Sequence, residues 1–330
     1  MWEATFEELC SFADGAGLDA RSFLQRRAEF EVLFHHVPVP AGSTLEVGCG
    51  GGFLTALLAR EGKLAVGIDM AAPDDLTHSR GLEAPGRLAR TLRAPNLRFL
   101  GCSGESLCFN DGSFDLVLSS YVLEHVPDRP RAVREMKRVT RPDGLIIALV
   151  PGWMERVYAP FNYYFILIWG TLRSAYRFLA QRIGRAPARD AAPRPGAEAA
   201  GSAAAPAPEE GVGDKIRKFF RVYHPTFPFP RPHGYYRSSS EELRAHRYRR
   251  WRRLFEAEGL VVERAFVTRI APTCLLEMIS DGADRAAQGA LAGTLRRHGE
   301  SRWARAVAYS WCFVLRKGDD APAAGEAGKD

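Results

Sequence analysis

Three glycines, Gly48, Gly50 and Gly52, are spaced as G-x-G-x-G directly after an apolar stretch at 43–47. Glycine turns the backbone sharply and lets a ligand approach it closely. From Phe53 onward the apolar residues recur at helical spacing, and a helix start offers free N–H groups to a ligand. The pattern predicts a strand, a turn and a helix that together hold a nucleotide-like ligand, although the glycine spacing alone also fits an ordinary tight turn.

Asp69 ends the next apolar stretch, at 64–69. A nucleotide-binding α/β unit places an acidic residue about 20 residues beyond its glycine turn, against the hydroxyl groups of a ribose. A surface aspartate at the end of a strand is the alternative. The glycine turn upstream favours the ribose role.

Two classes of protein share this arrangement, the dinucleotide-binding oxidoreductases and the class I S-adenosylmethionine-dependent methyltransferases. The run EVGCGGG at 46–52 resembles the first motif of the methyltransferases, and Phe53 occupies the position where a dinucleotide site usually has its third glycine. The segments 104–126 and 141–147 resemble later motifs of the same family, in the same order. The chain is therefore similar to class I methyltransferases of the type 11, UbiE-like group, most strongly over residues 20–150.

The resemblance implies S-adenosylmethionine as cofactor. It assigns the methionine moiety to the glycine turn, the ribose to Asp69, the adenine to 103–105 and the reactive methyl group to 119–125. The family often has an aspartate where this chain has Ser103, whose hydroxyl accepts a hydrogen bond without a charge. The implied cofactor-binding residues are Glu46, Gly48, Cys49, Gly50, Gly52, Phe53, Asp69, Met70, Ser103, Gly104, Glu105, Ser119, Ser120 and Tyr121.

Methyl transfer from a sulfonium requires an aligned nucleophile, and an oxygen acceptor also benefits from a general base. His125 and His233 are the candidate catalytic residues. His125 lies within the motif region, where orienting the loop is its alternative role. Further candidates on the substrate side are His224, Tyr235 and Tyr236.

The apolar stretches predict seven strands, at 43–48, 64–69, 97–101, 114–119, 144–150, 259–267 and 308–316. Helices are expected over 20–36, 53–60, part of 72–93, 130–140 and 239–258, the last with Ser239 and Glu242 as a capping box. Alternating strands and helices predict an α/β fold, here a Rossmann-like, seven-stranded, mostly parallel sheet with helices on both faces. The resemblance implies that the final strand is antiparallel.

The expected organisation places the cofactor-binding core at 1–150 and an inserted, mainly helical cap or substrate region at 151–258. Within the insertion, 184–213 is rich in Ala, Pro, Gly and Glu and is expected to be a disordered linker. The last strands of the core follow at 259–317, and 318–330 is expected to be a disordered tail.

Two segments of the insertion suggest its partners. Residues 160–180 are apolar and aromatic and then rich in arginine, which fits equally a lid helix and a helix at a membrane surface; the apolar part is too short to be a convincing span. Residues 214–253 hold twelve Lys and Arg against three acidic residues, a net charge of +9 where the whole chain has +6. A solvated arginine-rich face is the simplest interpretation of the second segment; an anionic substrate, an anionic membrane and nucleic acid are the others.

The favoured function is therefore methyl transfer to a small-molecule or lipid-linked acceptor, at an anionic membrane surface contacted through 160–180 and 214–253. Nucleic acid is disfavoured as a partner, since nothing resembles a dedicated RNA-binding module. A non-catalytic membrane or partner adaptor and an RNA methyltransferase are the alternatives. No metal-ligand spacing and no C-x-x-C pair occurs among the six cysteines, and no secretion signal opens the sequence, so a cytoplasmic protein is expected. The membrane hypothesis would place it at the inner face of a membrane.

Overall fold

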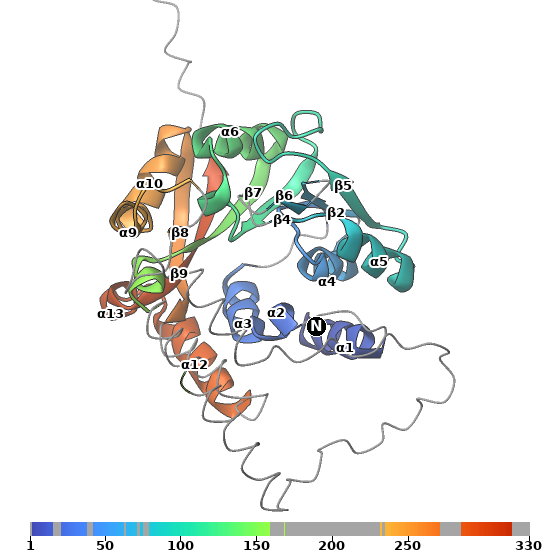
Figure 1. The fold of residues 1–330 in the computed structure, drawn as a ribbon, viewed down its shortest axis with the longest axis horizontal. Helices are drawn as coiled ribbons and strands as arrows, with labels where there is room; N and C mark the ends of the chain where they lie inside the picture. Colours follow the sequence, from blue (N-terminus) through green and yellow to red (C-terminus); the bar gives the residue numbers. More distant parts are fainter. Residues whose placement is uncertain are drawn as a thin grey trace, which may run out of the picture. The chain divides into compact units, whose positions relative to one another are not determined.

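In the computed structural model of the chain, seven strands form one sheet with the order β5-β2-β1-β6-β7-β9-β8 (Figure 1). Strand β9 runs antiparallel to β7 and β8, and the other neighbouring pairs are parallel. The mostly parallel sheet with an antiparallel last strand is thereby confirmed. The strands are β1 (Ser43–Val47), β2 (Leu64–Asp69), β5 (Leu97–Gly101), β6 (Phe114–Ser120), β7 (Thr140–Pro151), β8 (Leu260–Ile270) and β9 (Ala308–Lys317).

The structure describes residues 2–15, 21–37, 42–62, 64–70, 73–74, 79–158, 168, 232, 235–270 and 285–318. The chain divides into two units, of which one comprises 1–157 with 232–330 and the other 158–231. All that follows concerns the first unit. The predicted surface helix or lid at 160–180, the linker at 184–213, the basic residues before 232 and the tail after 318 lie outside the described residues, apart from Ile168.

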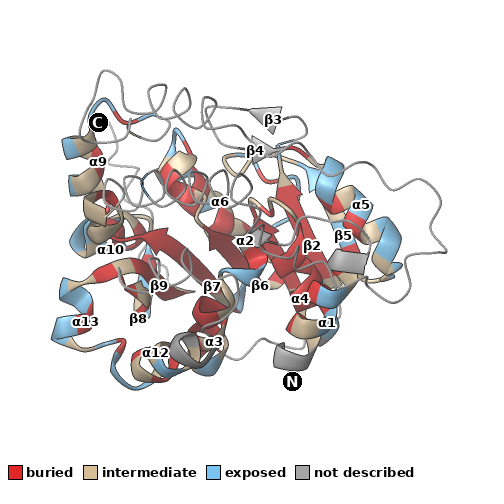
Figure 2. Cartoon of the chain, turned by 60° about the horizontal axis from the view of Figure 1, so that its bottom comes forward, coloured by how far each residue is buried: buried red, intermediate tan, exposed pale blue. Residues whose placement is uncertain are grey.

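Helices cover both faces of the sheet, as predicted. Helices α6 (Arg129–Val139), α9 (Ser239–Ala245) and α10 (Tyr248–Ala257) lie on one face, and α1 (Trp2–Gly15), α3 (Arg27–His36) and α4 (Phe53–Glu61) lie on the other (Figures 1 and 2). Helix α5 (Glu83–Leu92) packs against β5 and α4, and α12 (Arg285–His298) packs against α3. The short elements are α2 (Arg21–Leu24), β3 (Pro73–Asp74), β4 (Ser79–Arg80), the 3₁₀ helix η1 (Leu123–His125) and α13 (Arg302–Ala306).

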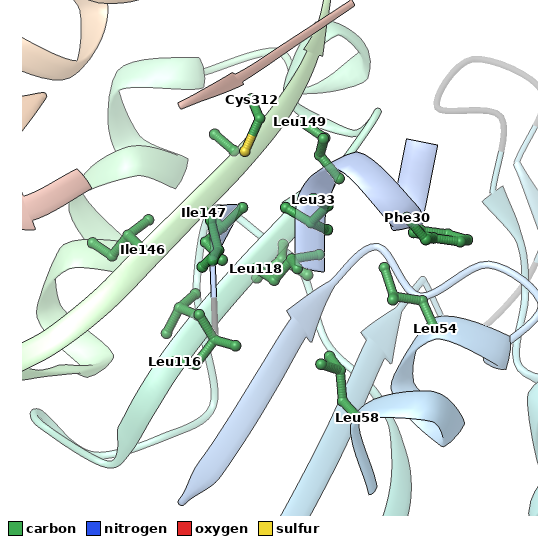
Figure 3. Packing of buried hydrophobic residues seen from close by; sticks show 14 of the residues in the cluster. Phe30, Leu33, Leu54, Leu58, Leu116, Leu118, Ile146, Ile147, Leu149 and Cys312 are labelled. Atoms are coloured by element: carbon green, nitrogen blue, oxygen red, sulfur yellow. The ribbon is translucent and has the colours of Figure 1, made fainter. Parts of the chain in front are cut away.

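The central strands are apolar on both sides because helices cover both faces. In β6 every residue but Asp115 is buried, and β7 is buried from Ile146 to Pro151. Figure 3 shows side chains from these two strands, among them Leu116, Leu118 and Ile147, in the main hydrophobic cluster. The centre of the sheet thereby provides a rigid base for the loops at its carboxyl edge.

Two predicted helices are each broken in two. The helix expected over 20–36 ends at Leu24 and begins again at Arg27, because Arg26 adopts a non-helical conformation as the residue before α3 and its guanidinium bonds Glu29 and Ser120. The helix expected over 239–258 is interrupted at His246 and Arg247, where Arg247 is extended. At Arg26 a long-range side-chain contact thus accompanies the departure from the local helical pattern.

The predicted capping box is displaced by one residue. Ser238 caps α9, since its hydroxyl accepts the N–H of Glu241 at 3.2 Å, and the Glu241 carboxylate accepts the N–H of Arg237. Glu242, which the sequence assigned to the cap, is fully buried and pairs with Arg156 at 2.9 Å. Strand β7 also begins earlier than predicted, at Thr140, where it already pairs with Phe114.

A buried carboxylate, Glu29 of α3, joins three parts of the chain. Its Oε1 accepts hydrogen bonds from the hydroxyls of Tyr121 (2.6 Å) and Thr268 (3.1 Å), and its Oε2 accepts one from Arg26 Nε (2.6 Å). Ser310 of β9 bonds Thr268 at 2.8 Å and completes the group. Burial acts to raise the pKa of Glu29, but the positive charges of Arg26 and Arg269 and these hydrogen bonds lower it below its ordinary value.

A second buried carboxylate, Glu46, connects β1 with α4. It is 3% exposed and accepts a hydrogen bond from the hydroxyl of Thr55. Burial raises its pKa to about 7, against the opposing effect of the Thr55 hydrogen bond. Glu29 is thus held ionised, whereas Glu46 gains and loses its proton close to neutral pH.

We expect Glu29→Gln to reduce the free energy of unfolding by about 3–5 kcal/mol at pH 7, since it removes a fully buried charge and leaves Arg26, only 21% exposed, without its ionised partner. Because the folded pKa is lowered, the stability that ionised Glu29 provides is present above its ordinary pKa of 4.5 and is lost as the pH falls through the folded value. Urea unfolding between pH 3 and 8 measures both effects. The control is Glu31→Gln on the same helix, whose pair with Arg296 is worth about 1 kcal/mol or less; equal losses in the two variants would refute the role of Glu29.

For Glu46 the stability changes with pH in the opposite direction. Because the folded pKa is raised from 4.5 to about 7, the wild-type protein loses stability as the pH rises between these values, on the order of 3 kcal/mol in total. Glu46→Gln keeps the acceptor for Thr55 but does not titrate, so the variant should match the wild type near pH 4.5 and exceed it at pH 8. Thermal unfolding across this range, with exposed Glu83→Gln as control, measures the difference. A variant less stable than the wild type at pH 8 would contradict the assignment.

Candidate functional site

The glycine turn adopts the predicted strand–turn–helix geometry. The N–H groups of Gly48 and Cys49 both donate to the carbonyl of Ile68 at 2.8 Å, which fastens the turn to the end of β2. Gly48, Gly50 and Gly52 have φ angles of +75°, +50° and +81°, in the left-handed region that favours glycine. At Gly48 a side chain is also excluded by packing, because a Cβ would overlap Val122.

Asp69 supports this turn from the neighbouring strand. One carboxylate oxygen accepts the N–H of Gly50 at 2.8 Å and the other accepts the N–H of Met70 at 2.8 Å. A carboxylate oxygen has more than one lone pair, so both can also accept hydrogen bonds from a ligand hydroxyl. The acidic residue and the glycine turn, which the sequence linked only by spacing, are therefore in direct contact.

Three predicted cofactor-binding side chains are buried behind the turn. Glu46 faces Thr55, Phe53 stacks on Phe23 with ring centroids 5.4 Å apart, and the Cys49 side chain is almost fully enclosed. Burial, together with the charges of Glu46 and Asp69, raises the pKa of the Cys49 thiol. These side chains hold the turn in shape, and contact with a ligand at Cys49 would be through its backbone.

A cavity of about 230 Å³ lies at the carboxyl edge of β1, β2 and β5. Seven of the predicted site residues line it: Gly48, Asp69, Met70, Ser103, Gly104, Glu105 and His125. The remaining lining residues are Val47, Ile68, Cys102, Val122, Val126, Pro127 and Tyr235. Tyr235, a predicted substrate-side candidate, thus lies at this cavity. The other candidate tyrosine, Tyr236, does not line it: Tyr236 is buried, and the guanidinium of Arg129 lies 4.6 Å from the centroid of its ring.

The loop after β5 is held by its own hydrogen bonds. The Ser103 hydroxyl accepts the N–H of Glu105 at 3.2 Å, and the Glu105 carboxylate accepts the N–H of Asp128 at 2.6 Å. The loop is thereby tied to the start of α6. It presents a carboxylate to the cavity even though the position that is often aspartate in the family is Ser103.

Ser119, Ser120 and Tyr121 do not line this cavity. Ser119 is fully buried, and the Ser120 hydroxyl accepts a hydrogen bond from Arg26 at 2.6 Å. Tyr121 has a φ of +56°, unusual for a side chain of its size, and donates its hydroxyl to Glu29. Burial and the charge of Glu29 raise the pKa of Tyr121 well above its ordinary value.

A second cavity, of about 250 Å³, shares His125 with the first. Its wall comes from widely separated parts of the sequence: Arg26, Tyr121, Glu124, His125, Pro151, Glu155, His246, Arg269 and Tyr309. His125 belongs to η1, and its Nε2 lies 4.0 Å from Glu124 Oε1. His233, the other candidate catalytic residue, lies outside the described residues. Glu155, His246, Arg269 and Tyr309 were not predicted as site residues, because no local sequence pattern indicates that they come together.

The sequence profile of the family described as "Methyltransferase domain" matches residues 45–148, which include the glycine turn, Asp69 and His125. An uncharacterized methyltransferase from Mycobacterium sp. (strain JLS) is 42% identical over 116 residues, which cover 35% of this chain and 41% of the relative. A ubiquinone biosynthesis O-methyltransferase from Albidiferax ferrireducens is 37% identical over 117 residues, or 35% of this chain and 44% of the relative. The match thus spans about two fifths of the length of these curated relatives.

Among solved structures, the YcgJ protein from Bacillus subtilis matches 88% of this chain and 99% of its own, with 17% identity and a TM-score of 0.41. The match to the family profile starts within β1 and ends within β7, so it covers the strands and loops that form the first cavity. The sequence profile and the curated relatives identify residues 45–148 as a methyltransferase domain.

Proposed function

We propose that the protein transfers a methyl group from S-adenosylmethionine in the first cavity to an acceptor in the second. The observation that carries this proposal is the position of His125, which lines both cavities. A displacement at the methyl carbon needs donor and acceptor to meet in line, and holding them together accounts for much of the rate. Two adjoining cavities with one shared side chain meet this requirement.

The first cavity suits the donor. The N–H groups of Gly48, Cys49, Gly50 and Gly52 are bonded within the protein, so we propose that the N–H of Gly51, beside the start of α4, meets the carboxylate of the methionine moiety. Asp69 lines this cavity and is proposed to accept hydrogen bonds from the ribose hydroxyls, and the loop at 103–105 is proposed to contact the adenine. Ser103 and the apolar residues Val47, Ile68 and Val126 are proposed to contact the adenine, with the Glu105 carboxylate beside them.

The second cavity suits a polar acceptor. Two tyrosines, Tyr121 and Tyr309, share its wall with the carboxyl groups of Glu124 and Glu155 and with two arginines. His125 can take the proton of an acceptor hydroxyl, and Glu124, at 4.0 Å, would stabilise the imidazolium that results. The O-methyltransferase from Albidiferax ferrireducens, whose name assigns it to ubiquinone biosynthesis, supports an oxygen acceptor on a small or lipid-linked molecule.

Two substitutions should separate the roles of the cavities. Asp69→Asn should weaken binding of S-adenosylhomocysteine about 10- to 100-fold, because it replaces a charge-assisted hydrogen bond to the ribose. His125→Gln should leave that affinity within about threefold and reduce kcat by about 10²- to 10⁴-fold, as expected for loss of a general base. Calorimetry measures the first effect, and methyl transfer to acceptors found by mass gain in cell extract measures the second.

The matched controls are Asp143→Asn and His298→Gln, both at exposed positions outside the two cavities. Wild-type protein that binds neither S-adenosylmethionine nor S-adenosylhomocysteine at millimolar concentration would favour the non-catalytic adaptor. Unchanged affinity in Asp69→Asn would remove the ribose assignment.

The acceptor is proposed to be handled at an anionic membrane surface. Trp251 and Phe255 of α10 face the core. Six arginines of α9, α10 and their junction are exposed: Arg244, Arg247, Arg249, Arg250, Arg252 and Arg253. Each basic residue near an anionic surface contributes roughly 1 kcal/mol. Among the described residues, no helix has both the length and the apolar character needed to cross a bilayer.

Flotation with vesicles of anionic lipid tests this proposal. Wild-type protein should float at low salt and be released as salt rises, since surface charges are screened. The double substitution Arg249→Glu with Arg253→Glu should weaken vesicle binding by about tenfold or more. The control is Arg87→Glu with Arg90→Glu on α5, which makes the same change of charge elsewhere and should weaken binding less. Absence of wild-type flotation at low salt would exclude the membrane surface, and equal losses in the two double variants would exclude this arginine face.

A further inference from the structure

Glu242 and His246 lie four residues apart at the end of α9 and therefore on one face of the helix. The N–H of His246 donates to the carbonyl of Glu242 at 2.9 Å, which shows that the helical turn is intact between them. Both side chains are fully buried. Two metal-ligand types thus project together from adjacent turns into the interior of the protein.

Glu155 completes a group of three from another part of the chain. It belongs to the helical segment 153–158 that follows β7, and its side chain is 19% exposed. One ligand atom each from Glu155, Glu242 and His246 lie within 4.8 Å of one another. This spacing allows a single ion to contact all three.

The imidazole of His246 gives an independent indication of a ligand. Neither ring nitrogen has a hydrogen-bond partner among the described residues, although Nδ1 lies 3.5 Å from Glu155 Oε2. A buried polar group without a hydrogen bond is costly, so such groups usually have a partner. Glu155 and His246 also line the second cavity, which provides room for one.

The charge and donor types select the ligand. Glu155 and Glu242 carry two negative charges against one positive charge on Arg156, whose Nε lies 2.9 Å from Glu242 Oε2. Arg156 orients Glu242, and the carboxylates of Glu155 and Glu242 are the group types that attract a divalent cation. An imidazole beside two carboxylates suits Mn²⁺, Fe²⁺, Co²⁺ or Zn²⁺, whereas Mg²⁺ and Ca²⁺ favour oxygen ligands alone.

We propose that Glu155, Glu242 and His246 bind a first-row divalent transition-metal ion at the wall of the second cavity. Three protein ligands leave coordination positions open, as in catalytic metal sites, and two of the three, Glu155 and His246, line the cavity. An acceptor oxygen bound there would be polarised by the ion and lose its proton more readily to His125. This catalytic role rests on the proposed methyl transfer, whereas metal binding itself does not.

Calorimetry with Mn²⁺ on tag-free, metal-stripped protein tests the site, because Mn²⁺ binds poorly to the free cysteine thiols. Wild-type protein should bind one ion per chain, and Glu155→Gln and His246→Asn should each weaken that binding at least tenfold. The matched controls are Glu256→Gln and His298→Asn, at exposed positions on α10 and α12. The absorption spectrum of the Co²⁺-loaded protein should show imidazole and oxygen coordination without a thiolate charge-transfer band.

Binding of S-adenosylhomocysteine and far-UV circular dichroism show whether each variant is folded; the isosteric Glu155→Gln is the variant least prone to misfold. The proposal is overturned if folded wild-type protein binds neither ion at millimolar concentration, or if both variants bind Mn²⁺ as tightly as the controls. It is also overturned if nitrogen NMR with saturating, diamagnetic Zn²⁺ shows that neither ring nitrogen of His246 coordinates the ion. Mn²⁺ binding without methyl transfer would leave the site standing and refute only the proposed function.

Discussion

The ionised carboxylate of Glu29 is the interaction on which the arrangement of both cavities depends. It lies where α3, the end of β6, β8 and β9 converge, and it accepts hydrogen bonds from three of these elements. A buried carboxylate is stable only with this degree of compensation. Because Tyr121 is one of the donors, Glu29 also determines where the chain leaves β6, and this exit leads directly to η1 and His125.

The donor side is coupled to the same segment by close packing. Val122 follows Tyr121 and occupies the space that a side chain at Gly48 would need. The turn that the sequence suggested for its contact with a ligand therefore also contacts the segment that carries His125. A single stretch, 121–125, thus touches the glycine turn on one side and the Glu29 group on the other, which explains how the two cavities share a wall.

The acceptor side is built by the parts of the chain that follow the insertion. Strands β8 and β9 supply Arg269 and Tyr309, and the interrupted helix at α9 supplies His246. The break between α9 and α10 lets His246 be buried while the arginines of α10 stay exposed. The last two strands therefore complete the sheet and at the same time close the second cavity.

The sequence by itself determined the order and approximate bounds of the seven strands, the glycine turn and Asp69. These features follow from local patterns: apolar runs that form strands, glycines at left-handed positions, and an acidic residue at a strand end. The helix breaks at Arg26 and at His246–Arg247, the true cap at Ser238 and the burial of Glu242 escaped it. Two of these depend on a partner far away in the sequence: the break at Arg26 on Ser120, and the burial of Glu242 on Arg156. Only the tertiary structure could decide these contacts, and with them the grouping of Glu155 and His246 beside His125, because burial energies and long-range hydrogen bonds outweigh the local preferences that a sequence displays.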